Sequence, residues 1–380
     1  MSTRNTAAFM AEEASALLSA LTAQQRARIC APANDRVGRH WYFTPAERDG
    51  VALADLSPRA QQNALRLLRS GLSEAGFALA TYILGLENLL ACEEGWMEQY
   101  PGRPGHGRSR DPQLYFVKIF GDPADETWGW QFAGHHLVAH AFVEDGRVAS
   151  LTPHFIGVNP AAAPSIGRNQ FRPLAGEEQI AIELVAGLNG AQRQRAVFSS
   201  VAPSDILQQN RPLVDDAALP SAPADIYPAD VPREEVVGFL AGLGIDAEAA
   251  DAAPDGPEIA AYAATDAGAR GVRVAELDPA GRELASELLA HYVERFPEDV
   301  RHAVFGWEPG EPLPADLRFA WAGSPQQGSG RYYCLDSANL TIEFDNTQNR
   351  ANHIHSALRS RRSDFASDIL RAHYLAEHPN

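Results

Sequence analysis

Two histidines stand one residue apart near the C-terminus, in the stretch NRANHIHSALRS at residues 349–360. Side chains at alternate positions of a β-strand point to the same face, so His353 and His355 would lie about 6.6 Å apart on that face. Neutral imidazoles in such a pair suit zinc, iron or copper. A polar patch on a strand is the alternative, and the choice depends on whether other segments supply further ligands.

A second histidine-rich segment, WGWQFAGHHLVAHAFVEDGRVASLTPHFIG, covers residues 128–157. Its alternating apolar residues predict one long strand over 128–143, and its Asp-Gly pair predicts a tight turn into a second strand. In this hairpin Glu144 pairs with Arg147, so the two residue numbers of every pair add up to 291 and Leu137 faces His154. His135 then lies one diagonal step from His154, within reach of a common metal ion. His136 would face the opposite way, where a histidine is more often part of a satisfied core.

The combined hypothesis is that the HxH pair and a histidine of the earlier segment, His135 or His136, bind one divalent transition metal ion. Consecutive residues of a regular strand point in opposite directions, so these two histidines do not both ligate from one strand. A bulge at Gly134 would turn one of them inward. The candidate ligands are His135, His136, His154, His353 and His355, and the candidate metals are zinc, iron and copper.

Polar residues around the HxH pair supply possible supporting groups. Asn346, Gln348 and Asn352 are placed to orient the imidazoles through their second nitrogens. Asp345 is predicted to act as a catalytic base, or alternatively to bind the metal itself. The alternative for the whole stretch DNTQNRAN is a polar turn stabilised by its own side chains.

A second catalytic candidate lies in LAGEEQIAIELVAGL, residues 174–188, which is predicted to be a helix. Glu183 is flanked there by apolar residues. If the helix buries this carboxylate, desolvation raises its pKa and suits it to act as a base. A glutamate on the exposed helix surface is the simpler interpretation.

Composition excludes several other functions. The formal net charge of -17 disfavours binding to nucleic acid or to anionic membranes. The three cysteines form no CxxC pair, which disfavours a thiolate zinc site and fits a reducing cytoplasm. No stretch reaches the roughly 20 apolar residues that span a bilayer. The common glycine-rich nucleotide and serine-hydrolase motifs are absent, and Lys118 is the only lysine.

The chain contains two similar segments, VALADLSP at residues 51–58 and VRVAELDP at residues 272–279. Each ends in a capping residue followed by proline at the first helical position, and a helical pattern follows. Strand-like patterns come next in both places. The sequence therefore predicts an α+β fold of two pseudo-repeated halves, each a capped helix followed by antiparallel strands.

The predicted boundaries follow from composition. Residues 1–210 form the N-terminal half, and residues 272–380 form the C-terminal half, which ends in an amphipathic helix over 364–378. A crossover rich in proline, alanine and aspartate, residues 211–271, connects them. The two halves are expected to pack as one unit.

Four stretches together resemble a bacterial and fungal family, the domain of unknown function 3500. They are RDPQLYFVKIFGDP, WGWQFAGHHL, TPHFIGVNPA and IEFDNTQNRANHIHS. The resemblance runs from about residue 20 to the C-terminus and carries no known activity. It implies that the family motif includes His135, His136, Asp345, Asn346, Gln348, Asn352, His353 and His355. In GRHWYF, residues 38–43, the family pattern has asparagine where this chain has His40.

The expected function is a metal-dependent enzyme acting on a small molecule or peptide. A hydrolase is the first choice, because metal-bound water attacking a carbonyl requires the fewest additional parts. A non-haem iron or copper oxygenase is the alternative with the same ligands. A ligand-binding protein with a metal-free histidine pocket, and a purely structural histidine cluster, are the other possibilities.

Overall fold

The centre of the molecule is one large mixed β-sheet, seen in a computed structural model. The structure describes residues 3–33, 35, 40–97, 110–219, 221–245, 247, 270–326 and 328–366. Within these residues the sheet has thirteen strands, ten of them in the order β1-β3-β4-β5-β7-β15-β14-β13-β12-β10. The outermost pairs, β1–β3 and β10–β12, are parallel and the pairs between them are antiparallel. The predicted α+β class is confirmed.

The strands of the large sheet are β1 (Cys30–Ala31), β2 (Val51–Ala52), β3 (Phe116–Gly121), β4 (Trp128–Gly134), β5 (Leu137–Glu144), β6 (Arg147–Ser150), β7 (His154–Val158), β10 (Val197–Ser199), β11 (Val272–Arg273), β12 (Arg318–Gly323), β13 (Arg331–Asp336), β14 (Leu340–Thr347) and β15 (His353–Ser360). Strands β8 (Ala163–Pro164) and β9 (Gln170–Phe171) form a separate small hairpin.

The helices are α1 (Thr3–Ser19), α2 (Ala23–Ile29), α3 (Pro58–Ser70), α4 (Glu74–Glu93), α5 (Ala175–Gly187), α6 (Gly190–Ala196), α7 (Arg233–Gly242), α9 (Pro279–Val293), α10 (Glu298–Phe305) and the short, irregular α11 (Gln348–Ala351). Single 3₁₀ turns are η2 (Leu53–Asp55), η3 (Pro223–Ile226), η4 (Val274–Glu276) and η5 (Asp364–Ala366). The predicted caps are present, since Ser57 and Asp278 accept hydrogen bonds from the first turns of α3 and α9.

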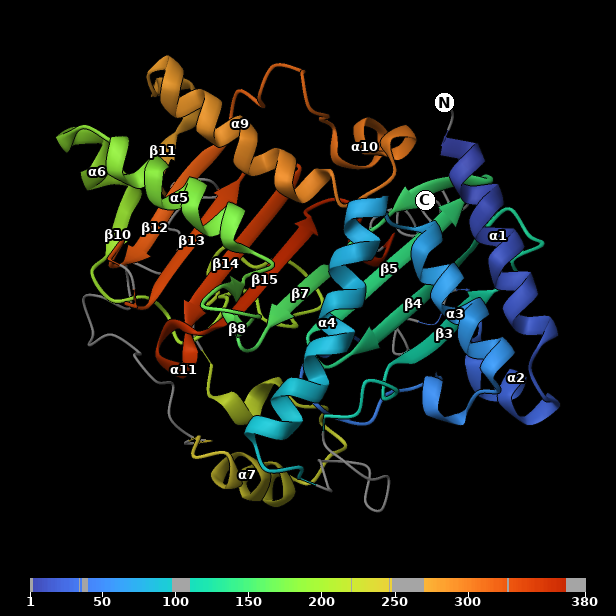
Figure 1. The fold of residues 1–380 in the computed structure, drawn as a ribbon. Helices are drawn as coiled ribbons and strands as arrows, with labels where there is room; N and C mark the ends of the chain where they lie inside the picture. Colours follow the sequence, from blue (N-terminus) through green and yellow to red (C-terminus); the bar gives the residue numbers. More distant parts are fainter. Residues whose placement is uncertain are drawn as a thin grey trace.

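The two faces of the sheet are covered differently (Figure 1). Helices α1, α3, α4, α5 and α9 lie across one face and enclose the largest core, which includes Trp128 and Trp130. Irregular segments, η3 and α7 cover the other face around a smaller core built on Trp41 and Phe155. Apolar residues therefore alternate between two cores along the central strands, which is why these strands are buried on both sides.

The predicted 128–143 strand is wrong, because it contains a hairpin. Gly134 of β4 pairs with Leu137 of β5, so His135 and His136 form a two-residue turn at the end of the sheet. A side chain at a turn is free of the alternation that a strand imposes. Both histidines therefore point toward the same end of the sheet, which a regular strand would prevent.

The predicted register of the following strands is also wrong beyond the first residues. Glu144 pairs with Arg147 as expected, but the pairing shifts between β5 and β6, and β7 then pairs two residues further along. Leu137 consequently faces Ile156 rather than His154. A bulge next to Phe142 contributes one residue of this shift, and no residue pattern signalled it.

The boundary predicted at residue 210 does not coincide with a boundary in the packing. Helix α5 packs on α9, and β10 pairs with β12, although α5 and β10 precede residue 210. Of the predicted crossover, η3 and α7 pack into the smaller core, while residues 220, 246 and 248–269 lie outside the described residues. Of the predicted C-terminal helix, only the 3₁₀ turn η5 lies within them.

Among the described residues one helix, α4, is long and apolar enough to cross a membrane by length and composition. The same test is passed by core helices of globular proteins. Ala80, Ile83 and Leu90 of α4 are buried inside the protein, and the helix packs on β5 and β7. It is therefore weak support for a membrane span.

Candidate metal centre

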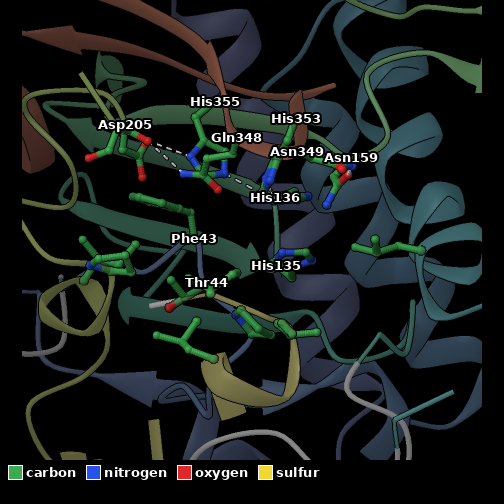
Figure 2. Close-up of a pocket in the computed structure, with 18 of the residues that line it drawn as sticks. Phe43, Thr44, His135, His136, Asn159, Asp205, Gln348, Asn349, His353 and His355 are labelled. Atoms are coloured by element: carbon green, nitrogen blue, oxygen red, sulfur yellow. Dashed lines mark hydrogen bonds and ion pairs between the residues drawn. The ribbon is translucent and has the colours of Figure 1, made fainter. Parts of the chain in front are cut away.

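Three histidine side chains converge at the end of the central strands (Figure 2). The Nε2 atom of His136 lies 2.9 Å from Nε2 of His353 and 3.4 Å from Nε2 of His355. The ligand atoms of these three residues all lie within 4.8 Å of one another. The structure thus brings together the HxH pair and one histidine of the earlier segment.

His136 owes its direction to the β4–β5 turn. Its φ is +62°, in the left-handed region that costs a residue with a side chain roughly 1–2 kcal/mol. Two backbone hydrogen bonds hold it there: its N–H donates to Phe43, and its carbonyl accepts from Gly157. A strained residue fixed on both sides in this way is typical of functional sites.

The HxH pair lies at the start of β15, after a loop that is also left-handed, with φ of +50° to +58° at Asn349, Arg350 and Ala351. Asn352 anchors this loop, since its backbone and side-chain oxygens accept from Ala161 and Ala162. The period of two puts both histidine side chains on the face covered by the smaller core, as expected.

The predicted supporting residues act on this loop rather than on imidazole nitrogens. The side-chain oxygen of Asn346 accepts from the backbone N–H of His353, and its amide donates to Glu178. Gln348 donates to the carbonyl of Ser204. Asn346, Gln348 and Asn352 therefore fix the backbone that carries the ligands, and the structure records no hydrogen bond from them to the rings of the cluster.

The group that orients an imidazole is Asp205, which the sequence analysis missed. Its Oδ1 lies 2.7 Å from Nδ1 of His355, and both side chains are buried. A carboxylate that accepts from Nδ1–H leaves the Nε2 lone pair free to face a metal ion. Asp205 lies in an irregular segment 150 residues away in the chain, so no local pattern connects it with His355.

Asp345 is beside His355 in the β14–β15 register, but it does not line the cavity. Its Oδ1 accepts from the backbone and hydroxyl of Thr347, while Oδ2 is buried with no hydrogen-bond partner in the structure. Desolvation, reinforced by the nearby carboxylate of Asp205, raises the pKa of Asp345 well above its usual range. Asp345 is therefore placed to hold Thr347 at the end of β14.

His135 has a different environment from His136, although their rings stack 3.5 Å apart. Its Nε2 lies 3.3 Å from a guanidinium nitrogen of Arg110, and its Nδ1 lies 2.6 Å from Glu87. Because a guanidinium only donates, Nε2 must accept, and Nδ1–H then donates to Glu87. The lone pair of His135 is therefore already engaged. Arg110 is held in turn by a two-point ion pair with Glu94.

Two predicted site residues lie elsewhere. His154 is on the opposite face of the sheet, buried against Phe296. The two-residue shift of β7 leaves its face unchanged, and the predicted diagonal contact with His135 is absent because His135 lies in the β4–β5 turn. Glu183 is exposed on α5 and accepts a hydrogen bond from Gln179, so the expected burial of its carboxylate is wrong. His40, the residue that departs from the family pattern, is also exposed, and its carbonyl accepts from Gln131.

Burial favours the neutral form of His135, His136 and His353. Desolvation lowers the pKa of His135, His136 and His353 well below the usual range, and the neighbouring charges of the same sign act in the same direction. Desolvation also raises the pKa of Glu87 to about 8. Neutral imidazole is the form that binds metal, so the electrostatics of the pocket match the chemistry of the ligands.

The two nitrogen–nitrogen separations from His136 are close to those of ligands on one metal ion. Two nitrogens that bind zinc tetrahedrally at about 2.1 Å lie about 3.4 Å apart. The His136–His355 separation equals this value, and the shorter His136–His353 separation requires a small rotation of one ring. All three histidines line a cavity of about 720 Å³, so a fourth position would open toward a bound molecule.

Gly157 provides a test of the position of His136. A Cβ at this residue would lie 2.5 Å from the His136 ring, so Gly157→Ala is expected to displace the imidazole. We expect metal affinity to fall about tenfold, the lower end of the loss seen when the support of a ligand is removed. Isothermal titration with zinc measures this. Gly187→Ala is the control, since nothing lies near its Cβ. Unchanged zinc affinity in Gly157→Ala would contradict the assigned role of His136.

Comparison with known proteins adds a family and no activity. None of the curated proteins and none of the solved structures is significantly similar to this chain. One family model, described as a protein of unknown function (DUF3500), matches residues 3–367, and this range contains every residue of the histidine cluster and its supports. The chain therefore belongs to the DUF3500 family.

Proposed function

We propose that the protein is a metal-dependent enzyme that acts on a small molecule or peptide, with His136, His353 and His355 as the metal ligands. The observation that carries the proposal is the convergence of three Nε2 atoms, 2.9 and 3.4 Å apart, at the wall of a cavity. Three protein ligands and one open position are typical of catalytic zinc sites.

A hydrolase is the first choice. A bound zinc ion would supply a water molecule of lowered pKa and would polarise a carbonyl group. The chain's own residues would orient the metal ligands. Asp205 holds the His355 ring, and Asn346, itself bonded to Glu178, holds the backbone N–H of His353. The same three imidazoles also suit iron or copper, so a non-haem oxygenase is the alternative within this proposal.

A metal-free histidine pocket is the second candidate, and one distance favours it. A separation of 2.9 Å between His136 and His353 is also the length of an ordinary N–H···N hydrogen bond. In that case one imidazole would donate to the other, and the cluster would bind a ligand without turnover.

Metal content separates these candidates. Protein made without a histidine tag and stripped with chelator is titrated with zinc, iron(II) and copper(II). We expect one ion per chain, and the metal that binds in preference decides between hydrolase and oxygenase. Absence of stoichiometric binding for all three metals would sink the metalloenzyme proposal and leave the metal-free pocket.

We also infer that the two halves derive from a duplication. The strand arrangement is similar at the two edges of the sheet. At each edge, a short strand pairs parallel with its neighbour, and antiparallel strands follow. Capping boxes start α2 at Thr22 and α6 at Asn189. The glutamine of each box donates to the last carbonyl of a 3₁₀ turn, Gln25 to η2 and Gln192 to η4. The metal cluster would then lie beside the seam between β7 and β15. A superposition of residues 22–158 on 189–360 tests this.

The cellular location is proposed on chemistry alone. Cys30, Cys92 and Cys334 are all free thiols, which supports a reducing compartment such as the cytoplasm. The strongly negative net charge argues against partners with phosphate backbones or anionic membranes.

A further inference from the structure

The cavity beside the histidine cluster has two chemically different walls. Around the histidines the lining is polar but mainly uncharged, with the side chains of Asn159, Gln209, Gln348 and Asn349. The opposite part is formed by the end of α4, by η3 and by the C-terminal end of α7. Its apolar residues are Leu90, Ile226, Tyr227, Leu240, Leu243 and Ile245.

The charges in the lining are unfavourable for an anion. Arg110 is the only arginine or lysine among the described residues that line the cavity, and its guanidinium makes two bonds to Glu94. Glu93 and Asp205 add further carboxylates, and the whole chain carries a formal charge of -17. In the absence of the metal, a carboxylate or phosphate entering the cavity would therefore meet repulsion, with no unpaired arginine or lysine among the described residues of the lining.

We propose that the ligand of this cavity is an uncharged molecule with an apolar body, which lies against η3 and α7, and a neutral oxygen-bearing group directed at the histidines. This deepens the proposed function and rests on it for the part played by the metal. A volume of about 720 Å³ falls within the 300–1,000 Å³ range that holds drug-sized ligands. Burial of the apolar body supplies the affinity, and the polar end fixes the orientation.

A matched pair of fluorescent probes tests the charge preference without any metal. N-phenyl-1-naphthylamine is neutral, and 8-anilinonaphthalene-1-sulfonate has the same rings with one added sulfonate. We expect the neutral probe to bind wild-type protein, stripped of metal, at least about tenfold more tightly than the sulfonate. Equal binding, or tighter binding of the sulfonate, overturns the proposal.

Variants locate the binding site of the neutral probe. Leu243→Gln and Ile245→Gln place an amide on the apolar wall at two half-buried positions and should each weaken binding at least about fivefold. Leu213→Gln is the control, because Leu213 is 60% exposed and outside the cavity. If the neutral probe binds all three variants as tightly as wild type, the apolar wall does not hold it. Should either variant fail to fold, binding of the neutral probe to Leu243→Ala, together with the comparison of the two probes on wild type, still tests the proposal.

A metal-chelating probe that is neutral in solution, and that loses a proton when it binds zinc, links the apolar wall to the histidines. Benzohydroxamic acid is expected to displace the naphthylamine from zinc-loaded protein at least about tenfold more effectively than acetohydroxamic acid, and to have little effect without zinc. If the naphthylamine binds as predicted but zinc does not, the metalloenzyme proposal fails while the preference for neutral, apolar ligands stands. If zinc binds but the two hydroxamic acids displace equally, the apolar body has no role and this inference fails.

Discussion

His355→Ala is expected to lower zinc affinity more than about 100-fold. Removal of a residue that only supports a metal ligand typically costs 10–100-fold, and removal of a ligand itself should exceed that. His355 has the firmest support of the three histidines, since Asp205 orients its ring and β14 and β7 flank its strand on both sides. His136 and His353 are already the other two proposed ligands, so neither can replace its nitrogen.

The same substitution should remove the stabilisation that zinc confers on the native state. At a zinc concentration of 100 times Kd, binding to the folded form alone adds about 2.7 kcal/mol to the free energy of unfolding. Thermal unfolding of wild type should shift upward with zinc, and that of His355→Ala should not. His136→Ala and His353→Ala are expected to behave alike.

His154→Ala is the matched control for these variants. His154 is also a buried histidine of a central strand, but it lies on the opposite face against Phe296. Its removal should reduce stability through the cavity it leaves and preserve stoichiometric zinc. If His355→Ala retains zinc with unchanged affinity, or if His154→Ala loses it, the ligand assignment is wrong.

Local periodicity was sufficient to predict part of this site. His353 and His355 share a face because they are two apart in a strand, and that rule holds whatever the strand pairs with. The capped helices α3 and α9 were likewise predictable, since cap residue, proline and apolar spacing all lie within one segment. These features depend only on neighbours in the chain.

Long-range pairing decided the features that the sequence did not reveal. The β4–β5 turn brought His135 and His136 to the end of the sheet. His154 lies on the face opposite to the HxH pair, since it pairs with Leu358 while Gly157 pairs with His355. Edge strands β1 and β10 have two and three residues, too few to show a periodic pattern. Asp205 reaches His355 only because its segment is fastened to the sheet, through contacts between residues more than 130 positions apart.

Glu343 is one of the residues that hold this segment on the sheet. It lies on β14, two residues before Asp345 and on the same face, and it is 2% exposed. Its carboxylate accepts from the backbone N–H groups of Leu207 and Gln208 at 2.7 and 3.1 Å and from the hydroxyl of Tyr332 at 2.8 Å. Burial raises the pKa of Glu343, and these hydrogen bonds oppose the shift. Glu343 therefore holds the segment that carries Asp205, together with Thr347 and Gln348, which both donate to the carbonyl of Ser204.

Glu343→Gln is expected to weaken both the fold and the metal site. The amide keeps one acceptor oxygen but turns an NH₂ group toward the N–H of Gln208, which leaves a buried donor unpaired and costs about 1–3 kcal/mol. The loosened segment should let Asp205 move from His355, so zinc affinity should fall about 10–100-fold. Urea unfolding and zinc titration measure the two effects separately.

A second buried carboxylate separates these effects. Glu177 on α5 is 4% exposed and pairs with Arg295 between the helices, on the face of the sheet away from the cluster. Glu177→Gln breaks a buried ion pair, so it should destabilise the fold at least as much as Glu343→Gln does. Its zinc affinity, measured below the unfolding transition, should match that of wild type. If both variants lose zinc affinity equally, the loss follows general stability and Glu343 has no particular role in positioning Asp205. A loss confined to Glu343→Gln, with stability reduced in both variants, identifies the 204–208 segment as the link between the sheet and the orientation of His355.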